Sequence, residues 1–251
     1  MKYIINIAIL SSFILCFTLS QATAASDYQL YLKSGDRSPK WNEFIEPGFQ
    51  SFDSGNYATS YVFLHRAYDL GCRDGLLLFR LGIFRETQGQ YKEAADILAQ
   101  AAEKIPQQYP NHPLIKSIHE HAGRVLYQAD DYDRALPELK KAIESAPDNF
   151  MLLFMAGQIS RIKKQYAEAK ELFERALKAP LPAGAPDARP KVLKELMILS
   201  CELKELDACL SYSVQVLAAA PQDATAISYK QKIEQERIKQ HEREIMEKMV
   251  K

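Results

Sequence analysis

The chain has 251 residues, of which 47% are hydrophobic and 25% are charged, an ordinary composition for a folded protein. Its 32 Lys and Arg side chains balance 32 Asp and Glu side chains, so the formal net charge is zero. This balance gives no electrostatic case for binding nucleic acid, which calls for a clustered basic face, and none for an anionic membrane surface.

The first 24 residues have the pattern of a secretory signal peptide. Lys2 precedes an apolar run over residues 3–19, and Ala22 and Ala24 supply the small residues of a cleavage site. We predict removal of residues 1–24, export, and residence in a periplasm. The alternative is an uncleaved segment that anchors the protein in the inner membrane, because the apolar run reaches the lower edge of a membrane span. Membrane contact is expected only in that case.

Residues 25–40 are polar. They contain turn signals at Ser34-Gly35-Asp36 and at Ser38-Pro39. We therefore predict a short polar lead-in before the first regular element.

From residue 41 to residue 221 the chain repeats one pattern of small and large apolar residues. The clearest copy, between Leu78 and Pro106, reads LxxLGxxxxxxGxYxxAxxxLxxAxxxxP. Other copies follow at steps of about 34 residues. We place the five units at residues 41–74, 75–108, 116–149, 150–183 and 190–223. The pattern resembles the tetratricopeptide repeat, a helix–turn–helix unit that must stack on its neighbours to bury its apolar face.

The resemblance implies an all-α fold, a right-handed α-solenoid of about five helix–turn–helix units. Gly82 has no side chain, so the second helix can approach closely where Ala94 faces it, and Gly89 is expected as a left-handed cap. Pro47 falls inside the first helix of the first unit, where proline usually kinks or restarts a helix. The first and fifth units are expected to form the ends of the array.

Residues 222–251 are predicted to form a long, highly charged C-terminal capping helix. Its apolar positions are sparse: Ile227, Ile233, Ile238 and Ile245. The first half is expected to cover the exposed face of the fifth unit, as terminal repeats require. The tail from Arg237 is too short and too polar for a coiled coil, so a solvated helix is the default and pairing with a partner helix is the alternative.

Removal of the signal peptide leaves three cysteines, an odd number and too few for a disulfide-stapled scaffold. Cys201 lies late in the first helix of the fifth unit and Cys209 early in the second, so they can meet across the turn in a disulfide. The competing interpretation is that both are small core residues, since free cysteine packs as a small hydrophobe. We favour the core interpretation and keep the disulfide as the alternative.

No catalytic motif is present in the sequence. Patterns of the G-x-S-x-G, H-E-x-x-H, C-x-x-C and phosphate-loop types are all missing. His119 and His121 lie two residues apart on one expected helix, a spacing that points them to different faces and prevents shared metal ligation. We therefore predict no enzymatic activity, no cofactor and no metal ion.

The remaining candidate site is the face of the first helices. In tetratricopeptide proteins these helices line a concave groove that grips peptides. The resemblance places eleven residues of this chain in that groove: Phe49, Phe52, Phe79, Ile83, Glu86, Arg124, Tyr127, Met151, Phe154, Arg161 and Lys194. The set is apolar and aromatic in the early units and becomes more basic towards the last.

Co-chaperone relatives use Lys and Asn in these positions to clamp a terminal carboxylate. This chain has other residues there: Phe79 and Ile83 in the second unit, and Phe154 and Gln158 in the fourth. The expected ligand is therefore an apolar segment. Core and groove positions are adjacent on one helix, so each aromatic residue has a competing interpretation as a core residue. If Phe79 and Phe154 lie in the groove, replacing both with Ala should abolish partner capture and leave the melting temperature nearly unchanged.

We expect a non-enzymatic, exported scaffold that binds an apolar peptide segment or helix of an envelope protein. The partner is a protein or peptide of unknown identity, and no nucleic acid is expected. One alternative is a self-assembling protein whose end repeats or C-terminal helix stack head to tail. Another is an accessory subunit of an envelope assembly, secretion or pilus complex, by analogy of fold alone.

Overall fold

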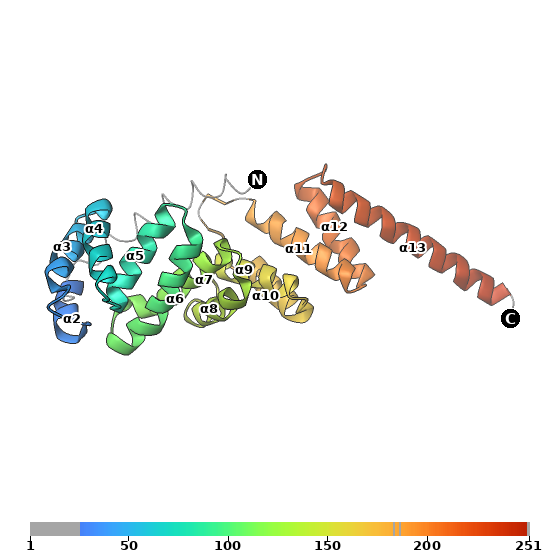
Figure 1. Ribbon diagram of the computed structural model, residues 1–251. Helices are drawn as coiled ribbons and strands as arrows, with labels where there is room; N and C mark the ends of the chain where they lie inside the picture. Colours follow the sequence, from blue (N-terminus) through green and yellow to red (C-terminus); the bar gives the residue numbers. More distant parts are fainter. Residues whose placement is uncertain (1–25, 183, 186, 250–251) are drawn as a thin grey trace. The chain divides into compact units, whose positions relative to one another are not determined.

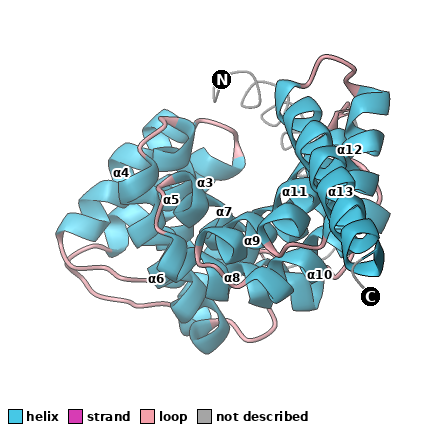
Figure 2. Cartoon of the chain, turned by 90° about the vertical axis from the view of Figure 1, so that its right-hand side faces the viewer, coloured by secondary structure: helices cyan, strands magenta, loops and turns pink. Residues whose placement is uncertain are grey.

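The helices of this chain follow the apolar periodicity of its sequence. The computed structural model describes residues 26–182, 184–185 and 187–249, and the predicted signal peptide lies outside them. Within those residues there are twelve α-helices, one 3₁₀ helix and no strand (Figures 1 and 2). None of these helices is long and apolar enough to cross a membrane.

The chain divides into two compact parts, each of which holds several of the predicted repeats. We call them unit 1 (residues 1–138) and unit 2 (residues 139–251), and the boundary between them falls inside one helix. Unit 1 holds α2 (Asp27–Ser34), α3 (Asn42–Asp53), α4 (Tyr57–Asp69), α5 (Gly75–Thr87), α6 (Tyr91–Gln108), η1 (Pro113–Lys116), α7 (Ile118–Gln128) and the start of α8 (Tyr132–Ser145). Unit 2 holds the rest of α8, α9 (Phe150–Ile162), α10 (Tyr166–Lys178), α11 (Ala188–Glu202), α12 (Leu206–Ala219) and α13 (Ala224–Met249). Successive helices pack in hairpins, which is the α-solenoid class of fold.

A glycine on the first helix closes the hairpin of α5 and α6. A Cβ on Gly82 would lie 2.5 Å from the Cγ of Leu98, closer than real Cβ atoms come to any neighbour. Close approach was predicted here, but with Ala94 opposite the glycine. The structure places the larger Leu98 there, so the side chain of the second helix fills the space that glycine leaves empty.

The turn between the two helices of a hairpin needs one residue with a left-handed backbone. Gly89 has a φ of +73°, as predicted for the cap that ends α5. The equivalent turns after α9 and α11 place Lys164 and Lys204 at a φ of 60°. A side chain is disfavoured in that conformation, so these two turns carry backbone strain that the glycine turn avoids.

The N-terminal region differs from expectation in two ways. The polar lead-in contains a helix, α2, whose N-cap Ser26 accepts a hydrogen bond from the Gln29 N–H at 3.3 Å. This helix forms because its residue Tyr31 is buried against the rest of unit 1. The polar composition of the segment does not reveal that burial. Helix α3 also continues through Pro47, where only the hydrogen bond to the Glu43 carbonyl, in the first turn, is lost.

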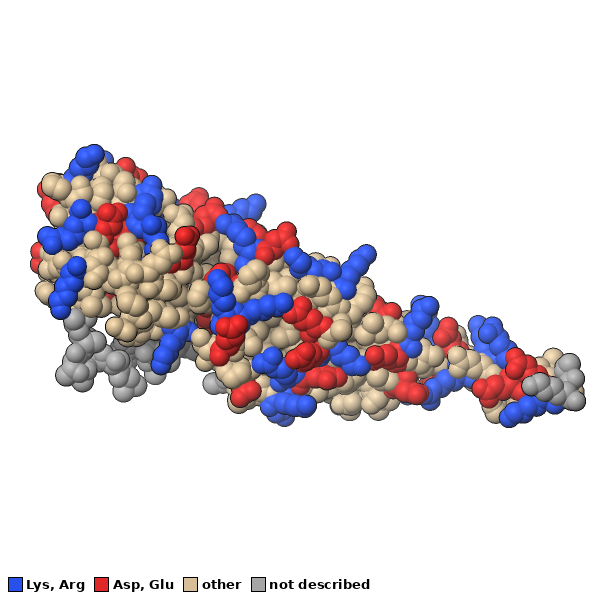
Figure 3. Space-filling model, turned by 90° about the horizontal axis from the view of Figure 1, so that it is seen from below, with Lys and Arg blue, Asp and Glu red and all other residues tan. Residues whose placement is uncertain are grey.

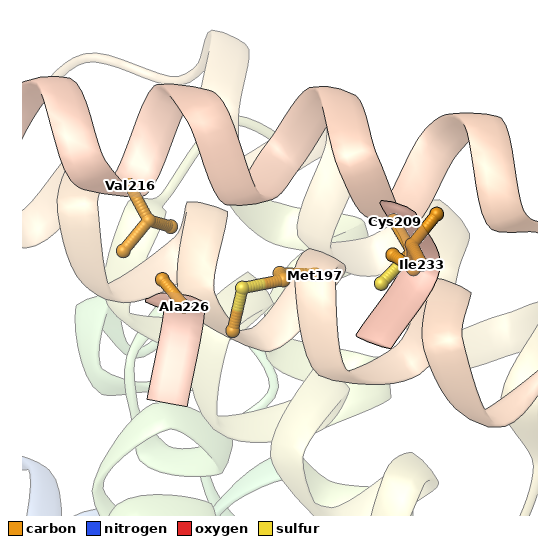
Figure 4. Packing of buried hydrophobic residues seen from close by; sticks show 5 residues of the cluster. All are labelled: Met197, Cys209, Val216, Ala226 and Ile233. Carbon is orange, nitrogen blue, oxygen red and sulfur yellow. The ribbon is translucent and has the colours of Figure 1, made fainter. Parts of the chain in front are cut away.

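One core cluster of unit 2 joins three helices. Met197, Cys209, Val216, Ala226 and Ile233 form a buried cluster at the contact of α11, α12 and α13 (Figure 4). The first part of α13 therefore covers the last hairpin, as expected for a capping helix. After Ile233 every described residue of α13 is exposed, and Figure 1 shows the helix continuing past α12.

A disulfide joins Cys201 and Cys209 across the turn from α11 to α12, with their Cα atoms 5.1 Å apart. The favoured interpretation of two unbridged core residues is therefore wrong. Cys209 is buried, as that interpretation required, but the tight turn also brings the Cα of Cys201 within bridging distance. Cys72 of unit 1 is a buried free thiol.

Candidate functional site

A buried arginine stands at the centre of the first-helix face of unit 1. Arg80 of α5 is 3% exposed, and its guanidinium carbon lies 4.2 Å from the ring centre of Phe49 and 4.8 Å from that of Phe52. Its Nη1 donates to the Leu76 carbonyl at 3.2 Å. A cation buried among aromatic rings needs an anion, since an unpaired buried charge is strongly unfavourable.

Helix α2 supplies that anion. The Arg80 Nη2 donates to Asp27 Oδ2 at 2.6 Å and lies 3.4 Å from Asp53 Oδ1, while Asp27 Oδ1 is 2.9 Å from His112 Nε2. Because His112 Nδ1 accepts the Leu114 N–H at 3.1 Å, the ring proton lies on Nε2 and is donated to Asp27. Burial alone raises the pKa of Asp27, but the hydrogen bond from His112 and the charge of Arg80 outweigh burial and lower it to about 2.

Two tyrosines complete the contact of α2 with α3. The rings of Tyr28 and Tyr31 meet Phe49 edge to face, with ring centres 6.5 and 5.8 Å away. The Tyr28 hydroxyl donates to Glu46 at 3.2 Å, and the Tyr31 hydroxyl donates to the Asp36 carbonyl at 2.8 Å. We call the residues that receive α2 the α2 seat: Phe49, Phe52, Asp53, Arg80 and His112.

Asp36 ties the chain after α2 to the turn before α5. Its N–H donates to Asp74 Oδ2 at 3.1 Å, and its carboxylate accepts the Arg73 N–H at 3.2 Å. The Tyr109 hydroxyl donates to the same Asp74 oxygen at 2.6 Å, and the other Asp74 oxygen caps α5 by accepting the Leu76 N–H at 2.9 Å. Burial raises the pKa of Asp74 in spite of these hydrogen bonds.

Two of the predicted groove residues of unit 1 are core residues. Phe49 is 0% exposed beneath α2, and Phe79 is 2% exposed with its ring edge-on to His121, 5.3 Å between centres. Neither can contact a ligand while the helices keep their places. Every residue of α5 from Gly75 to Gly82 is buried and no face of that stretch is free for a groove, so Phe79→Ala is now expected to lower the melting temperature.

The other predicted residues of unit 1 remain partly accessible. Three of them are half-buried apolar or aromatic side chains: Phe52, Ile83 and Tyr127. Beside them Arg124 of α7 pairs with Glu86 of α5, with 2.9 Å between Nη2 and Oε1. Burial raises the pKa of Glu86 against the opposing charge of Arg124, and burial lowers the pKa of the neighbouring His121 to about 3. This ion pair links the first helices of adjacent hairpins.

The aromatic residue predicted for unit 2 has a double role. Met151 and Phe154 of α9 are both half-buried. The Phe154 ring stacks on Phe150 and also packs against Phe173, with 5.9 Å between ring centres in each case. Phe154→Ala would therefore remove packing as well as exposed surface, and Met151 is the cleaner probe of this face.

The basic residues predicted for unit 2 are paired with acids. Gln158 donates to Glu195 Oε1 at 2.9 Å, and Arg161 Nε lies 2.9 Å from Glu195 Oε2. Lys194 Nζ lies 2.6 Å from Asp223. The face that looked basic in sequence is therefore locally neutralised, and its charges fix α9, α11 and the start of α13 relative to one another.

The sequence did not predict Asp27 or three residues of the α2 seat: Asp53, Arg80 and His112. One signal was present, because Arg80 interrupts the apolar run from Leu76 to Leu81 and a charge in such a run needs a buried partner. The partner Asp27 lies 53 residues earlier in a polar segment, so no local pattern connects the two.

Charge on the surface is mixed. On the face drawn in Figure 3, Lys and Arg side chains are interspersed with Asp and Glu side chains. Among the residues that the structure describes, no three His, Cys, Asp or Glu side chains are gathered as a metal ion would require.

Stacked helical hairpins with partly exposed first helices define a class of protein–protein interaction scaffolds, the helical-repeat solenoids. Models of the tetratricopeptide repeat match residues 75–148 and 122–188 of this chain. Residues 75–188 are therefore built of tetratricopeptide repeats.

Solved structures share the fold. YrrB, described as a TPR protein with an unusual peptide-binding site, is 15% identical, with 84% of this chain and 100% of YrrB covered and a TM-score of 0.58. MamA from Desulfovibrio magneticus RS-1 is 17% identical, with 75% and 100% covered and a TM-score of 0.50. MamA AMB-1 is 20% identical, with 72% and 92% covered and a TM-score of 0.54. No curated protein sequence matches the chain.

Proposed function

We propose that this protein is an exported scaffold that binds an apolar segment of a partner protein on the first-helix faces of its hairpins. One observation carries the proposal: in each unit the first helices carry half-buried apolar side chains together with charges that are paired between adjacent first helices. These apolar residues are Ile83 and Tyr127 in unit 1, and Met151 and Ile198 in unit 2. Side chains already held by their neighbours lose little freedom on binding, which lowers the entropic cost of association.

The pairing of the cations favours an apolar segment over a chain-end carboxylate. Arg124, Arg161 and Lys194 each lie within ion-pair distance of a carboxylate of this chain. An incoming carboxylate would have to replace Glu86, Glu195 or Asp223 and leave that acid without its partner. An apolar side chain that enters between the pairs adds contact area and leaves the ion pairs in place.

A peptide-display selection against the mature chain tests this function. Met151→Asp should weaken the selected peptides about tenfold or more, because a charge then replaces an apolar contact. The matched control is Val214→Asp on α12, where Val214 is 50% exposed on a second helix, and it should bind as the wild type does. Melting temperatures verify that both variants fold. Equal weakening by both variants, or a selection that enriches no peptide, would contradict the proposal.

Export is part of the proposal and is supported by the bridge between Cys201 and Cys209. Disulfides persist in oxidising compartments such as the periplasm and are rare in the reducing cytosol. The signal-peptide pattern supports the same conclusion, and we expect the isolated protein to begin at Ala25. N-terminal sequencing of the protein from a fractionated envelope measures this. An intact Met1 end in the membrane fraction would favour the uncleaved anchor.

Self-assembly is the second candidate, and the distal half of α13 favours it. Ile238, Ile245, Met246 and Met249 are exposed there with relative exposures of 59%, 44%, 64% and 76%. Light scattering after size exclusion should show a mass that rises with concentration if copies associate through this helix. Ile238→Glu combined with Ile245→Glu should then return the protein to a constant monomer mass. A wild-type mass that is constant over the whole range excludes this candidate.

A further inference from the structure

We propose that the α2 seat is a binding site for an acidic, aromatic helix. Helix α2 occupies this site as an intramolecular ligand. A partner helix of the same chemistry binds in the seat when α2 leaves it. The seat lies on the first-helix face of unit 1, where α2 contacts α3 and reaches Arg80 of α5. This inference rests on the proposed binding function, and it names the partner class for one part of the face.

The seat has the chemistry of a carboxylate receptor. Each oxygen of the Asp27 carboxylate has its own donor, Arg80 Nη2 at 2.6 Å and His112 Nε2 at 2.9 Å. Without α2, the guanidinium would keep the Leu76 carbonyl, and the acid left beside it would be Asp53, 3.4 Å away with a side chain 51% exposed; the Arg80 Nε already lacks an acceptor. An arginine among aromatic rings without a close anion is unfavourable, so another carboxylate that takes the place of Asp27, between Arg80 Nη2 and His112 Nε2, is stabilised there.

The contacts of α2 also define the sequence of a replacement helix. Asp27 is the first helical residue after the Ser26 cap, so its carboxylate lies where the helix dipole favours negative charge. Tyr28 and Tyr31, one and four positions later, both meet Phe49 edge to face. The partner class is therefore a helix that begins Asp-Tyr-x-x-Tyr, or an equivalent with other aromatic residues at those two positions.

The build of α2 allows it to leave as a unit. It has only eight residues, and a helix of that length is unstable in water without tertiary contacts. Its contacts concentrate on Asp27, Tyr28 and Tyr31. The next anchor, Asp36, is bound to the turn before α5 and lies beyond Gly35. Opening at Gly35 therefore frees α2 and leaves the hairpins of unit 1 tied together.

The test measures a fluorescent, end-blocked peptide with the sequence of residues 26–34 against the full mature chain. Anisotropy should show weak binding to the wild type, where α2 fills the seat. The opened variant Asp27→Asn/Tyr31→Ala should bind the peptide about tenfold or more tightly than the wild type, the factor expected for a charge-assisted contact. Adding Arg80→Met to the opened variant, or Asp27→Asn to the peptide, should remove that gain. The control Lys33→Ala, at an exposed position of α2, should behave as the wild type.

Hydrogen exchange of the wild type keeps the test decisive if the opened variant fails to fold. Amides of α2 should exchange about tenfold or more faster than those of α5, by local opening that leaves the hairpins intact. Exchange of α2 only together with α5 would show a fixed cap and overturn the inference. So would a folded opened variant that binds the peptide no more tightly than the wild type, or binding that ignores Arg80. None of these readouts involves Met151 and α9, so failure here is distinguishable from failure of the proposed function.

Discussion

Replacing Gly82 with Ala tests whether close helix approach determines the stability of unit 1. The new Cβ would lie 2.5 Å from Leu98 Cγ and 2.7 Å from Cδ2, so Leu98 must change rotamer or α6 must move outward. Overpacking of this kind costs about 1–3 kcal/mol. Alanine is favoured over glycine inside a helix by about 1 kcal/mol. We therefore expect a net loss of about 0–2 kcal/mol in the free energy of unfolding.

A double-mutant cycle with Leu98→Ala tests whether the expected loss comes from the contact between the new Cβ and Leu98. Leu98 is fully buried, so Leu98→Ala alone should cost about 2–5 kcal/mol. In the double variant the new methyl group occupies space that the leucine vacated, so the combined loss should be smaller than the sum by the overpacking cost, about 1–3 kcal/mol. The control is Gly89→Ala, which has a φ of +73° and no atom within 4 Å of the added Cβ. It should cost about 1 kcal/mol through the backbone alone and add independently to Leu98→Ala.

The single tryptophan makes the assay specific for unit 1. Trp41 lies in that unit, where its Nε1 donates to the Asp36 carbonyl at 2.8 Å, so its fluorescence should report the unfolding of unit 1 in urea. The close-approach reasoning would be refuted if the stability losses of Gly82→Ala and Leu98→Ala sum to the loss of the double variant within about 0.3 kcal/mol. A Gly82→Ala variant more stable than the wild type would refute it as well.

Three further predictions concern the bridge, a strained turn and acid stability. Reducing the bond between Cys201 and Cys209 should lower the stability of unit 2 by about 2–3 kcal/mol, the loop-closure value for so short a loop, and an unchanged melting temperature in reductant would contradict this. Lys164→Gly should raise the urea midpoint and add about 1 kcal/mol to the free energy of unfolding, because the φ of 60° at this position suits glycine. Lys164→Ala should bring no such gain. The pKa of Asp27 is about 2 in the folded chain against an ordinary 3.8. This carboxylate therefore adds about 2 kcal/mol to the free energy of unfolding. The contribution is present above about pH 4 and is lost as the pH falls through about 2. Asp27→Asn should therefore flatten the acid limb of the Trp41 unfolding profile, and a limb identical to that of the wild type would contradict the pairing with Arg80 and His112.

The placement of side chains on the first helices shows where sequence reasoning stops. Phe79 and Ile83 lie four positions apart on α5, and both were predicted for the groove from the same repeat pattern. Phe79 is buried against His121, whereas Ile83 is half-buried. Helical periodicity assigns a residue to one side of a helix, but adjacent core and groove positions differ only in what a neighbouring helix covers. Exposure at such a border is decided by packing.

The sequence alone determined the hairpins, the left-handed turn at Gly89 and the helix that covers the last repeat, because each depends on residues close together along the chain. Tertiary structure alone decided whether Cys201 and Cys209 are bridged, since that depends on a Cα separation of 5.1 Å across a turn. It also decided that helix α2 of the same chain covers part of the candidate face. Asp27 and Arg80 are 53 residues apart, and only the folded chain brings a carboxylate from a polar segment onto a cation within an apolar helix. Local periodicity specifies the elements, and buried charge selects its partner at long range.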